Sequence, residues 1–271
     1  MYDKARTAAS ELALSKLARN LTQYHEDIVI AGGWAPYYIT QGRFHHCGSE
    51  DIDLVLKTKI PRQDESICDI LRRIGYIRVG KFQFQKRERS PVDNWLYSVE
   101  LDLLCEEEGA GVRSGLCEVQ EGLKARPFRG LEIAFDFNYE PEIGTNFPLE
   151  SHSNAKIKVI DLVGCFALKG QSLKDRDDEE KKLKDAYDIF ALTYYGGGPS
   201  DAATHFNQTV SRTVLPLRNL RLLQDSYFYI RDSFSDKTQI GPVSVETFAP
   251  EHSSDRAVAR MKGFLDNIKF D

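Results

Sequence analysis

The stretch IVIAGGWAPYYITQGRFHHCGSEDIDLVL, residues 28–56, constrains this sequence more than any other part of it. One apolar run ends at Gly32-Gly33, and a second apolar run contains Asp51 and Asp53. The pattern predicts a strand, a tight glycine turn, a short helix, a loop and a second strand. Residues i and i+2 of a strand point to the same face, so the two acids would lie about 6–7 Å apart. Two neighbouring carboxylates are costly unless a cation joins them, which indicates a divalent-metal site.

The composition of the whole chain narrows the class of protein. With 271 residues, 41% of them hydrophobic and 28% charged, it is typical of a soluble protein with one large or two modest domains. The net charge of -5 argues against an overall electrostatic grip on nucleic acid, although local basic patches are compatible with it. No apolar run approaches the ~20 residues of a membrane span. Five scattered cysteines without a C-x-x-C pair predict reduced thiols and a cytoplasmic protein.

Periodicity predicts an α+β protein in two parts: a mixed sheet flanked by helices over residues 1–155, and a helical domain over residues 156–271. Outside residues 28–56, the elements expected in the first part are helices over 3–21 and from Pro61 to Gly75, an alternating segment over 76–86, and strands over 95–104 and 131–137. The elements expected in the second part are helices over 159–173, 179–195, 200–210, 212–233 and 252–269.

The strand WLYSVELDLL offers a third carboxylate. Its apolar residues Val99, Leu101 and Leu103 alternate with acids, which would therefore share the other face. If this strand is an antiparallel neighbour of the strand that holds the aspartate pair, then Asp102 or Glu100 would lie across from that pair. Three acids on adjacent strands can hold Mg²⁺. A solvated sheet face is the alternative, and it is the commoner origin of an isolated D-x-D.

The glycine turn adds a second signal. Glycines let backbone N–H groups approach a phosphate closely, and the start of a helix favours negative charge. An ordinary strand-to-helix turn is the alternative for Gly32-Gly33 taken alone. A Gly-Gly turn followed by D-x-D on the next strand is much more specific than either feature.

At this point the sequence resembles the nucleotidyltransferases of the DNA-polymerase-β-like superfamily. The segments IAGGWA and DIDLVL are similar to that superfamily's glycine turn and acidic strand, and they resemble both AbiEii-type toxins and small antibiotic nucleotidyltransferases. The gap from Gly33 to Asp51 is longer than usual. A second pair, Gly48-Ser49, resembles the AbiEii-type Gly-Ser motif. We favour Gly32-Gly33 as the phosphate-binding pair, with Ser49 assisting.

The resemblance extends into the helical part. Lys169 and Arg176 are seven residues apart and would share one face of a continuous helix, as a lysine and an arginine do in AbiEii-like proteins. The following Lys184-Asp185 and Asp188 are similar to a K-x-R/K-D-x-x-D segment of that family. A solvated charged helix is the better explanation of residues 177–182, but it does not explain Lys169 inside an apolar stretch.

The resemblance implies a Mg²⁺-dependent transfer of NMP from an NTP to an acceptor hydroxyl, with release of pyrophosphate. It also implies that two metal ions are bound. Asp51, Asp53 and Asp102 would be the catalytic and metal-binding residues, and Glu100 competes with the last of them. The NTP would be bound by Gly32, Gly33, Ser49, Lys169 and Arg176. A toxin-like enzyme acting on RNA (such as a tRNA end) or on protein, with a cognate antitoxin, is the main hypothesis. The alternatives are an aminoglycoside-type adenylyltransferase and a non-catalytic binding module.

Two further segments are less specific. Basic residues alternate with aromatic ones between Arg72 and Arg89, which is compatible with RNA binding, but we favour a hairpin with its charges outward. The run His45-His46-Cys47 lacks partners at zinc-like spacing and predicts a mobile loop. The remaining histidines receive no role.

Overall fold

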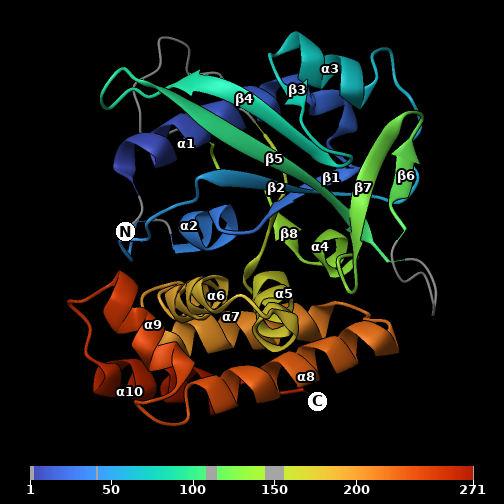
Figure 1. The fold of residues 1–271 in the computed structure, drawn as a ribbon. Coiled ribbons are helices and arrows are strands. Elements are labelled where there is room, and N and C mark those ends of the chain that lie inside the picture. The colour runs from blue at the N-terminus through green and yellow to red at the C-terminus, as the bar shows by residue number, and fades with distance from the viewer. Residues whose placement is uncertain (1–2, 41, 108–114, 144–155, 271) are drawn as a thin grey trace. The chain divides into compact units, whose positions relative to one another are not determined.

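The computed structural model describes residues 3–40, 42–107, 115–143 and 156–270. The chain forms two compact units (Figure 1): the first contains residues up to Ala35 and Cys47–Ile160, and the second contains Pro36–His46 and the chain from Asp161 onward. The first unit holds a mixed sheet with helices, and the second is helical. The expected α+β class is therefore confirmed.

The sheet of the first unit has nine strands among the described residues, ordered β3-β4-β5-β2-β1-β9-β8 along its main path. The strand β7 pairs with β5, and β6 pairs with β7. The strands are β1 (Ile28–Ala31), β2 (Asp51–Leu56), β3 (Ile77–Arg78), β4 (Gln83–Arg89), β5 (Leu96–Glu106), β6 (Cys117–Gln120), β7 (Leu123–Phe128), β8 (Asn138–Tyr139) and β9 (Val159–Ile160).

Strands β1 and β2 lie in the middle of the sheet because their residues are nearly all apolar. The β1 strand is buried along its length, and β2 is buried from Leu54 to Leu56. The two strands run antiparallel, as a connection through a short helix permits. The expected antiparallel pairing of β2 with β5 is wrong, because these strands run parallel. The long connection through α3 (Ile67–Arg73), β3 and β4 supplies the crossover that a parallel pair needs.

Helix α1 (Lys4–Asn20) packs on the sheet against β4 and β5 (Figure 1). It is tied there by Lys16, whose ammonium lies 2.8 Å from Glu88, while Lys86 approaches the other oxygen of that carboxylate at 3.0 Å. Both Glu88 and Lys86 are buried. The expectation that the hairpin turns its charges outward is therefore wrong for these two residues. Their charges are tolerated inside because each has an oppositely charged partner.

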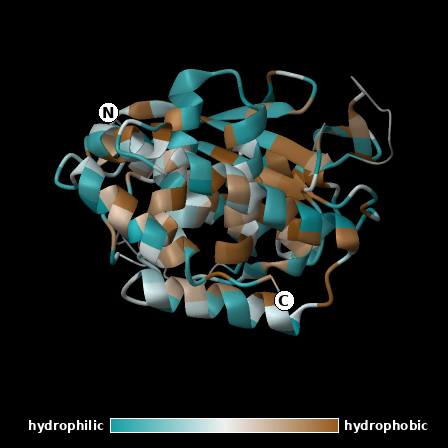
Figure 2. Ribbon diagram, turned by 90° about the horizontal axis from the view of Figure 1, so that it is seen from below, coloured by the Kyte–Doolittle hydropathy of each residue, from teal (hydrophilic) through white to brown (hydrophobic). Residues whose placement is uncertain are grey.

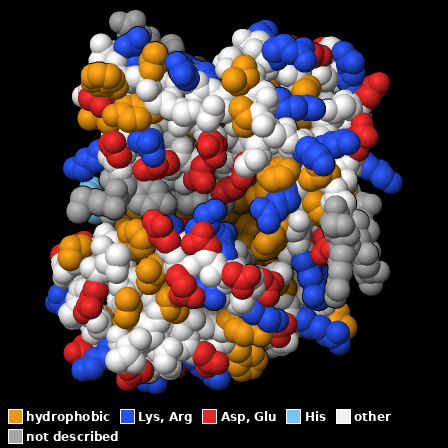
Figure 3. All heavy atoms as spheres, in the orientation of Figure 1, with side chains coloured by type: hydrophobic (Ala, Val, Ile, Leu, Met, Phe, Trp, Pro, Cys, Tyr) orange, Lys and Arg blue, Asp and Glu red, His pale blue; other side chains and the backbone are white. Residues whose placement is uncertain are grey.

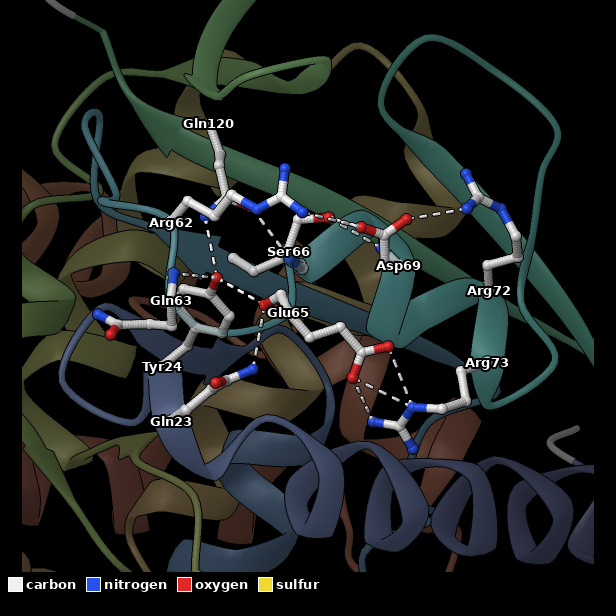
Figure 4. Close-up of polar contacts among 11 residues, drawn as sticks. Gln23, Tyr24, Arg62, Gln63, Glu65, Ser66, Asp69, Arg72, Arg73 and Gln120 are labelled. Atoms are coloured by element: carbon white, nitrogen blue, oxygen red, sulfur yellow. Dashed lines mark hydrogen bonds and ion pairs between the residues drawn. The ribbon is translucent and has the colours of Figure 1, made fainter.

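Helix α3 (Ile67–Arg73) begins six residues later than expected, because Ser66 rather than Pro61 caps it. Figure 4 shows the contacts of the irregular segment that precedes it. The buried Tyr24 hydroxyl donates to the carbonyl of Glu65 at 2.9 Å and accepts the backbone N–H of Gln63 at 3.0 Å. The hydroxyl thus uses the Glu65 carbonyl, which in a helix starting at Pro61 would accept the backbone N–H of Asp69.

Residues 131–137 do not form the expected strand; they contain the short helix α4 (Ile133–Asp136). The carboxylate of Glu106 accepts the backbone N–H of Gly130 at 3.1 Å and that of Glu132 at 2.8 Å. This carboxylate binds the donors at the start of the turn, so they are not free to pair with a strand.

The second unit contains most of α2 (Trp34–Thr40) and all of α5 to α10. Hydrophobic and hydrophilic residues alternate along its helices, as helices with one buried face require (Figure 2). Helix α9 was not expected from the sequence. The helices of this unit that follow α2 are α5 (Leu162–Asp175), α6 (Glu179–Leu192), α7 (Pro199–Arg212), α8 (Leu217–Ser233), α9 (Ile240–Phe248) and α10 (Ser254–Leu265).

The loop that follows α2 was expected to be mobile, yet its aromatic side chains are buried in the second unit. The Phe44 ring stacks on Tyr194 with 4.7 Å between ring centroids, and His46 stacks on Tyr187 at 5.2 Å. These contacts anchor Pro36–His46 among the helices.

On the face drawn in Figure 3, acidic and basic side chains are interspersed. Among the described residues, no helix is long and apolar enough to cross a membrane. All five cysteines are free thiols, as expected.

Candidate active site

The carboxylates of the first unit meet where β2 and β5 pair. The parallel register places Asp102 directly opposite Asp53, and it places Glu100 opposite Asp51. Paired residues of adjacent strands point to the same face about 4.8 Å apart, so Asp53 and Asp102 are immediate neighbours. Val99, Leu101 and Leu103 of β5 alternate with these acids and are fully buried, as the sequence pattern predicts.

Asp51 and Asp102 each accept a hydrogen bond from a neighbouring side chain. The hydroxyl of Ser49 donates to Asp51 Oδ1 at 2.7 Å. The amide of Gln83, on β4, donates to Asp102 Oδ1 at 3.1 Å.

The glycine turn touches the acids directly. Gly32 has a φ angle of +65°, a conformation that only glycine adopts at little cost. A Cβ atom at this position would lie 1.9 Å from Asp53 Oδ2, so the carboxylate rests against the bare backbone of the turn. Any side chain at Gly32 would displace Asp53.

The two candidate phosphate turns lie side by side. A Cβ atom at Gly33 would lie 2.8 Å from Ser49 Oγ and 3.6 Å from the carbonyl oxygen of Gly48. The first helix supports the second turn, because Thr7 donates to the carbonyl of Cys47 at 3.3 Å. Gly32-Gly33 and Gly48-Ser49 therefore form one backbone surface beside Asp51 and Asp53, and they need not compete for a phosphate.

The three aspartates are of the residue type that binds a hard cation, but their side chains are not arranged around a common point. Aspartate oxygens are the ligands that Mg²⁺ prefers. Among the described residues, however, no three His, Cys, Asp or Glu side chains are gathered closely enough to hold a metal ion. Asp51 is exposed, and Asp53 and Asp102 are partly exposed, so rotation of the Asp51 side chain about χ1 has room to occur.

The predicted basic residues belong to the second unit, where they surround two buried acids. Lys169, on α5, lies 2.7 Å from Asp185 and 2.7 Å from Asp188, both on α6. Burial opposes the charge of Lys169, but the two carboxylates outweigh it and hold the pKa of the ammonium well above its ordinary value. Burial also opposes the charge of Asp188, yet Lys169 and Lys184 keep the pKa of this carboxyl far below its usual range.

The spacing predicted that Arg176 and Lys169 share a continuous helix, but they do not. Helix α5 ends at Asp175, and Arg176 caps it with extended backbone angles. Its guanidinium still reaches the same cluster, because Nε lies 3.2 Å from Asp185 Oδ2. The two predicted cations are thus brought together through Asp185.

His46 is the residue that the sequence reasoning missed. Its Nε2 lies 2.9 Å from Asp188 Oδ1, and both side chains are completely buried. The available signal was that Asp185 and Asp188 stand on the apolar face of α6 among buried residues, and so need buried partners. Nothing in the sequence indicated that the partner would come from a loop more than 140 residues earlier.

The chain is similar to one family of known proteins. A family model described as "Nucleotidyl transferase AbiEii toxin, Type IV TA system" matches residues 17–260. No curated protein matches the chain. A crystal structure of an antigenic nucleotidyltransferase-like protein from Paracoccidioides brasiliensis is 16% identical, with 93% of each chain covered and a TM-score of 0.46. JHP933 from Helicobacter pylori is 15% identical, with 95% of this chain and 89% of that chain covered, at a TM-score of 0.44.

Proposed function

The chain belongs to the AbiEii nucleotidyltransferase toxin family, and from this premise we propose that it transfers an NMP from an NTP to an acceptor hydroxyl at Asp51, Asp53 and Asp102. The observation that carries this site is the register of β2 and β5, which sets Asp102 opposite Asp53 while Gly32 supports the Asp53 carboxylate from the turn.

Each residue of the site has a defined part in this proposal. Backbone N–H groups of Gly32 and Gly33, with the hydroxyl of Ser49, bind oxygens of the β- and γ-phosphates. Asp51 and Asp53 are the ligands of divalent ions, which when bound supply positive charge that offsets the phosphates. Asp102, oriented by the amide of Gln83, accepts the proton of the acceptor hydroxyl as it attacks the α-phosphorus.

The basic residues of the second unit complete the proposal. Lys169 and Arg176 bind phosphate oxygens of the NTP, because their cluster contains more cations than carboxylates. Charge-assisted hydrogen bonds from such groups stabilise phosphate strongly. Pyrophosphate leaves as the P–O bond between the α-phosphorus and its bridging oxygen breaks.

The biological role that fits the family is that of a toxin with a cognate antitoxin. The family model describes a type IV toxin-antitoxin system, and an NTP is the expected donor. The acceptor that we propose is the terminal hydroxyl of an RNA or a hydroxyl of a protein.

Labelled NTPs with Mg²⁺ would test the activity. The wild-type protein, Asp51→Asn, Asp102→Asn and Glu100→Gln would each be incubated with total RNA, with protein extract and with an aminoglycoside panel. We expect label in RNA or protein with the wild type and a loss of at least about 100-fold for the two aspartate variants. Glu100→Gln distinguishes the two acids of β5, and Asp64→Asn, at an exposed position of the first unit, is the matched control.

The outcomes separate the hypotheses. Transfer that survives Asp51→Asn would remove the site assignment. Label on an aminoglycoside alone would replace the toxin proposal with a small-molecule one. Loss of transfer in Glu100→Gln but not in Asp102→Asn would exchange the roles of those two acids.

A further inference from the structure

His46 joins the Pro36–His46 segment to the charged cluster of the second unit. This cluster consists of Lys169, Arg176, Lys184, Asp185 and Asp188. The His46 ring is completely buried, stacks on Tyr187 and places Nε2 2.9 Å from Asp188 Oδ1. This histidine is not part of the proposed chemistry, yet it touches the carboxylate that both lysines of the cluster share.

The hydrogen bond has a fixed direction. Burial, and then the positive charge of Lys184, lower the pKa of His46 to about 4, so its imidazole is neutral near pH 7. An ionised carboxylate can only accept, and Asp188 stays ionised because of its lysine neighbours. The proton of the neutral ring therefore sits on Nε2 and is donated to Asp188.

Asp188 in turn determines where two ammonium groups lie. Its Oδ2 is 2.7 Å from Lys169, and its Oδ1 accepts from Lys184 as well as from His46. Lys169, Lys184 and Arg176 carry three positive charges against the two negative charges of Asp185 and Asp188, which leaves one net positive charge. Lys169 and Lys184 have side chains only 12% exposed, so small shifts of Asp188 would change how each ammonium meets an anion.

We propose that His46 is a positioning residue for phosphate binding: it fixes the Asp188 carboxylate and through it the ammonium groups of Lys169 and Lys184. The inference rests on the proposed function, in which this cluster binds the phosphates of an NTP. His46 adds no charge of its own. A charged residue there would bring either a third carboxylate or a fourth cation to the cluster, whereas a neutral N–H donor orients Asp188 without changing its charge.

The alternative is that His46 merely fills space in an aromatic cluster. A phenylalanine would then serve as well, because the neighbours of His46 include the rings of Tyr187, Phe44 and Tyr37. The two roles differ in one atom, the N–H that reaches Asp188.

The test compares His46→Phe, which keeps a ring and removes the donor, with His46→Gln, which keeps an N–H donor of similar reach. Phe44→Leu is the matched control, since Phe44 is buried in the same segment and contacts Tyr187 but makes no polar contact with the cluster. Reductive methylation followed by peptide mass spectrometry measures the reactivity of Lys169 and Lys184 without any nucleotide. The KM for the NTP and the kcat are then measured for each variant.

With His46→Phe, we expect Lys169 and Lys184 to become several-fold more reactive while the exposed Lys81 is unchanged. The KM for the NTP would rise by about tenfold with a smaller change in kcat. His46→Gln would restore both values, and Phe44→Leu would lower thermal stability without either effect.

Equal lysine reactivity in His46→Phe and the wild type would overturn the inference, and so would a failure of His46→Gln to differ from His46→Phe. If the lysine reactivity rises but the KM is unchanged while Asp51→Asn abolishes transfer, the cluster does not bind phosphates; the inference then fails and the proposed function stands. Failure of the proposed function itself is seen separately, as transfer that Asp51→Asn does not reduce.

Discussion

At the scale of single residues, the absence of a side chain at Gly32 is as important to the candidate site as the acids themselves. The Asp53 carboxylate occupies the space that a Cβ atom at Gly32 would take, and the backbone there has a positive φ angle. Both requirements are met by glycine alone. The D-x-D pattern therefore depends on the turn that precedes it by about twenty residues.

Gly32→Ala tests this dependence. The substitution strains the positive φ by about 1 kcal/mol and moves Asp53, so we expect nucleotidyl transfer to fall by at least about 100-fold. Gly122→Ala is the control, because Gly122 also has a positive φ but has nothing within 4 Å of the added Cβ. Denaturant unfolding and labelled-NTP transfer measure the two variants. Equal losses of transfer in both would show that backbone strain, rather than contact with Asp53, is responsible.

The pH dependence of stability follows from His46. An unfolded histidine takes up a proton near pH 6.5, whereas folded His46 does so only near pH 4. The unfolded chain therefore binds more protons between these values, and stability falls as pH decreases from 6.5 to about 4. The difference of about 2.5 pKa units corresponds to about 3 kcal/mol over the whole interval.

Urea unfolding of the wild type and of His46→Gln between pH 7.5 and pH 4.5 measures this contribution. Burial raises the pKa of Asp161 to about 6, and this group acts with the opposite sign, because its stabilising protonation is lost as pH rises. The contribution of Asp161 is common to both proteins, so it cancels when the free energy of unfolding of His46→Gln is subtracted from that of the wild type. Parallel stability curves for the two proteins would contradict the assignment of the pH dependence to His46.

At the scale of elements, close approach between helices α5 and α8 depends on a second glycine. A Cβ atom at Gly170 would lie 2.5 Å from Ser226 Cβ and 2.9 Å from its Cα, which belongs to the backbone of α8. The Ser226 hydroxyl donates to the carbonyl of Ala167 at 2.8 Å, so the helices are also joined by a hydrogen bond. Helix α5 carries Lys169, and its position is set by this contact.

Gly170→Ala should destabilise the protein by about 1–3 kcal/mol, because the helices must separate to admit the methyl group. Gly263→Ala in α10 is the matched control, since its added Cβ meets nothing nearer than 3.6 Å. We expect that control to be neutral or stabilising by up to about 1 kcal/mol through helix propensity. Thermal and urea unfolding measure both, and a stable Gly170→Ala protein would mean that α8 moves away at little cost.

At the scale of the whole molecule, neither unit is a continuous piece of chain. The segment Pro36–His46 groups with the helices, although its flanking residues group with the sheet. The Phe44 ring lies 4.7 Å from Tyr194 and 5.9 Å from Phe190, centroid to centroid, so this segment is part of the core of the second unit.

A fragment containing only residues 161–271 should therefore expose apolar surface. We expect it to bind the dye ANS and to unfold without cooperativity, because it lacks Phe44 and His46. A fragment with residues 36–46 joined to it by a flexible linker should regain a cooperative transition. Circular dichroism during thermal unfolding provides the comparison, and a cooperative transition in the shorter fragment would show that the helices form a complete core alone.

The sequence by itself determined the local features of this protein. The first helix, the β1 strand, the glycine turn, β2 and most helices of the second unit follow from periodicity, glycine positions and capping residues, which are short-range properties. The acids Asp51 and Asp53 and the alternating face of Asp102 were also readable, because side-chain direction in a strand repeats every two residues.

Only the tertiary structure decided which distant residues meet. The parallel pairing of β2 with β5, the inward turn of Lys86 and Glu88, the late start of α3 and the burial of His46 against Asp188 all depend on contacts across many residues. In each case several partners are compatible with the local sequence. The partner that forms is the one that best satisfies a buried charge or a buried N–H group, because leaving such a group without a partner costs free energy. Local patterns carry no information about that cost until the chain is folded.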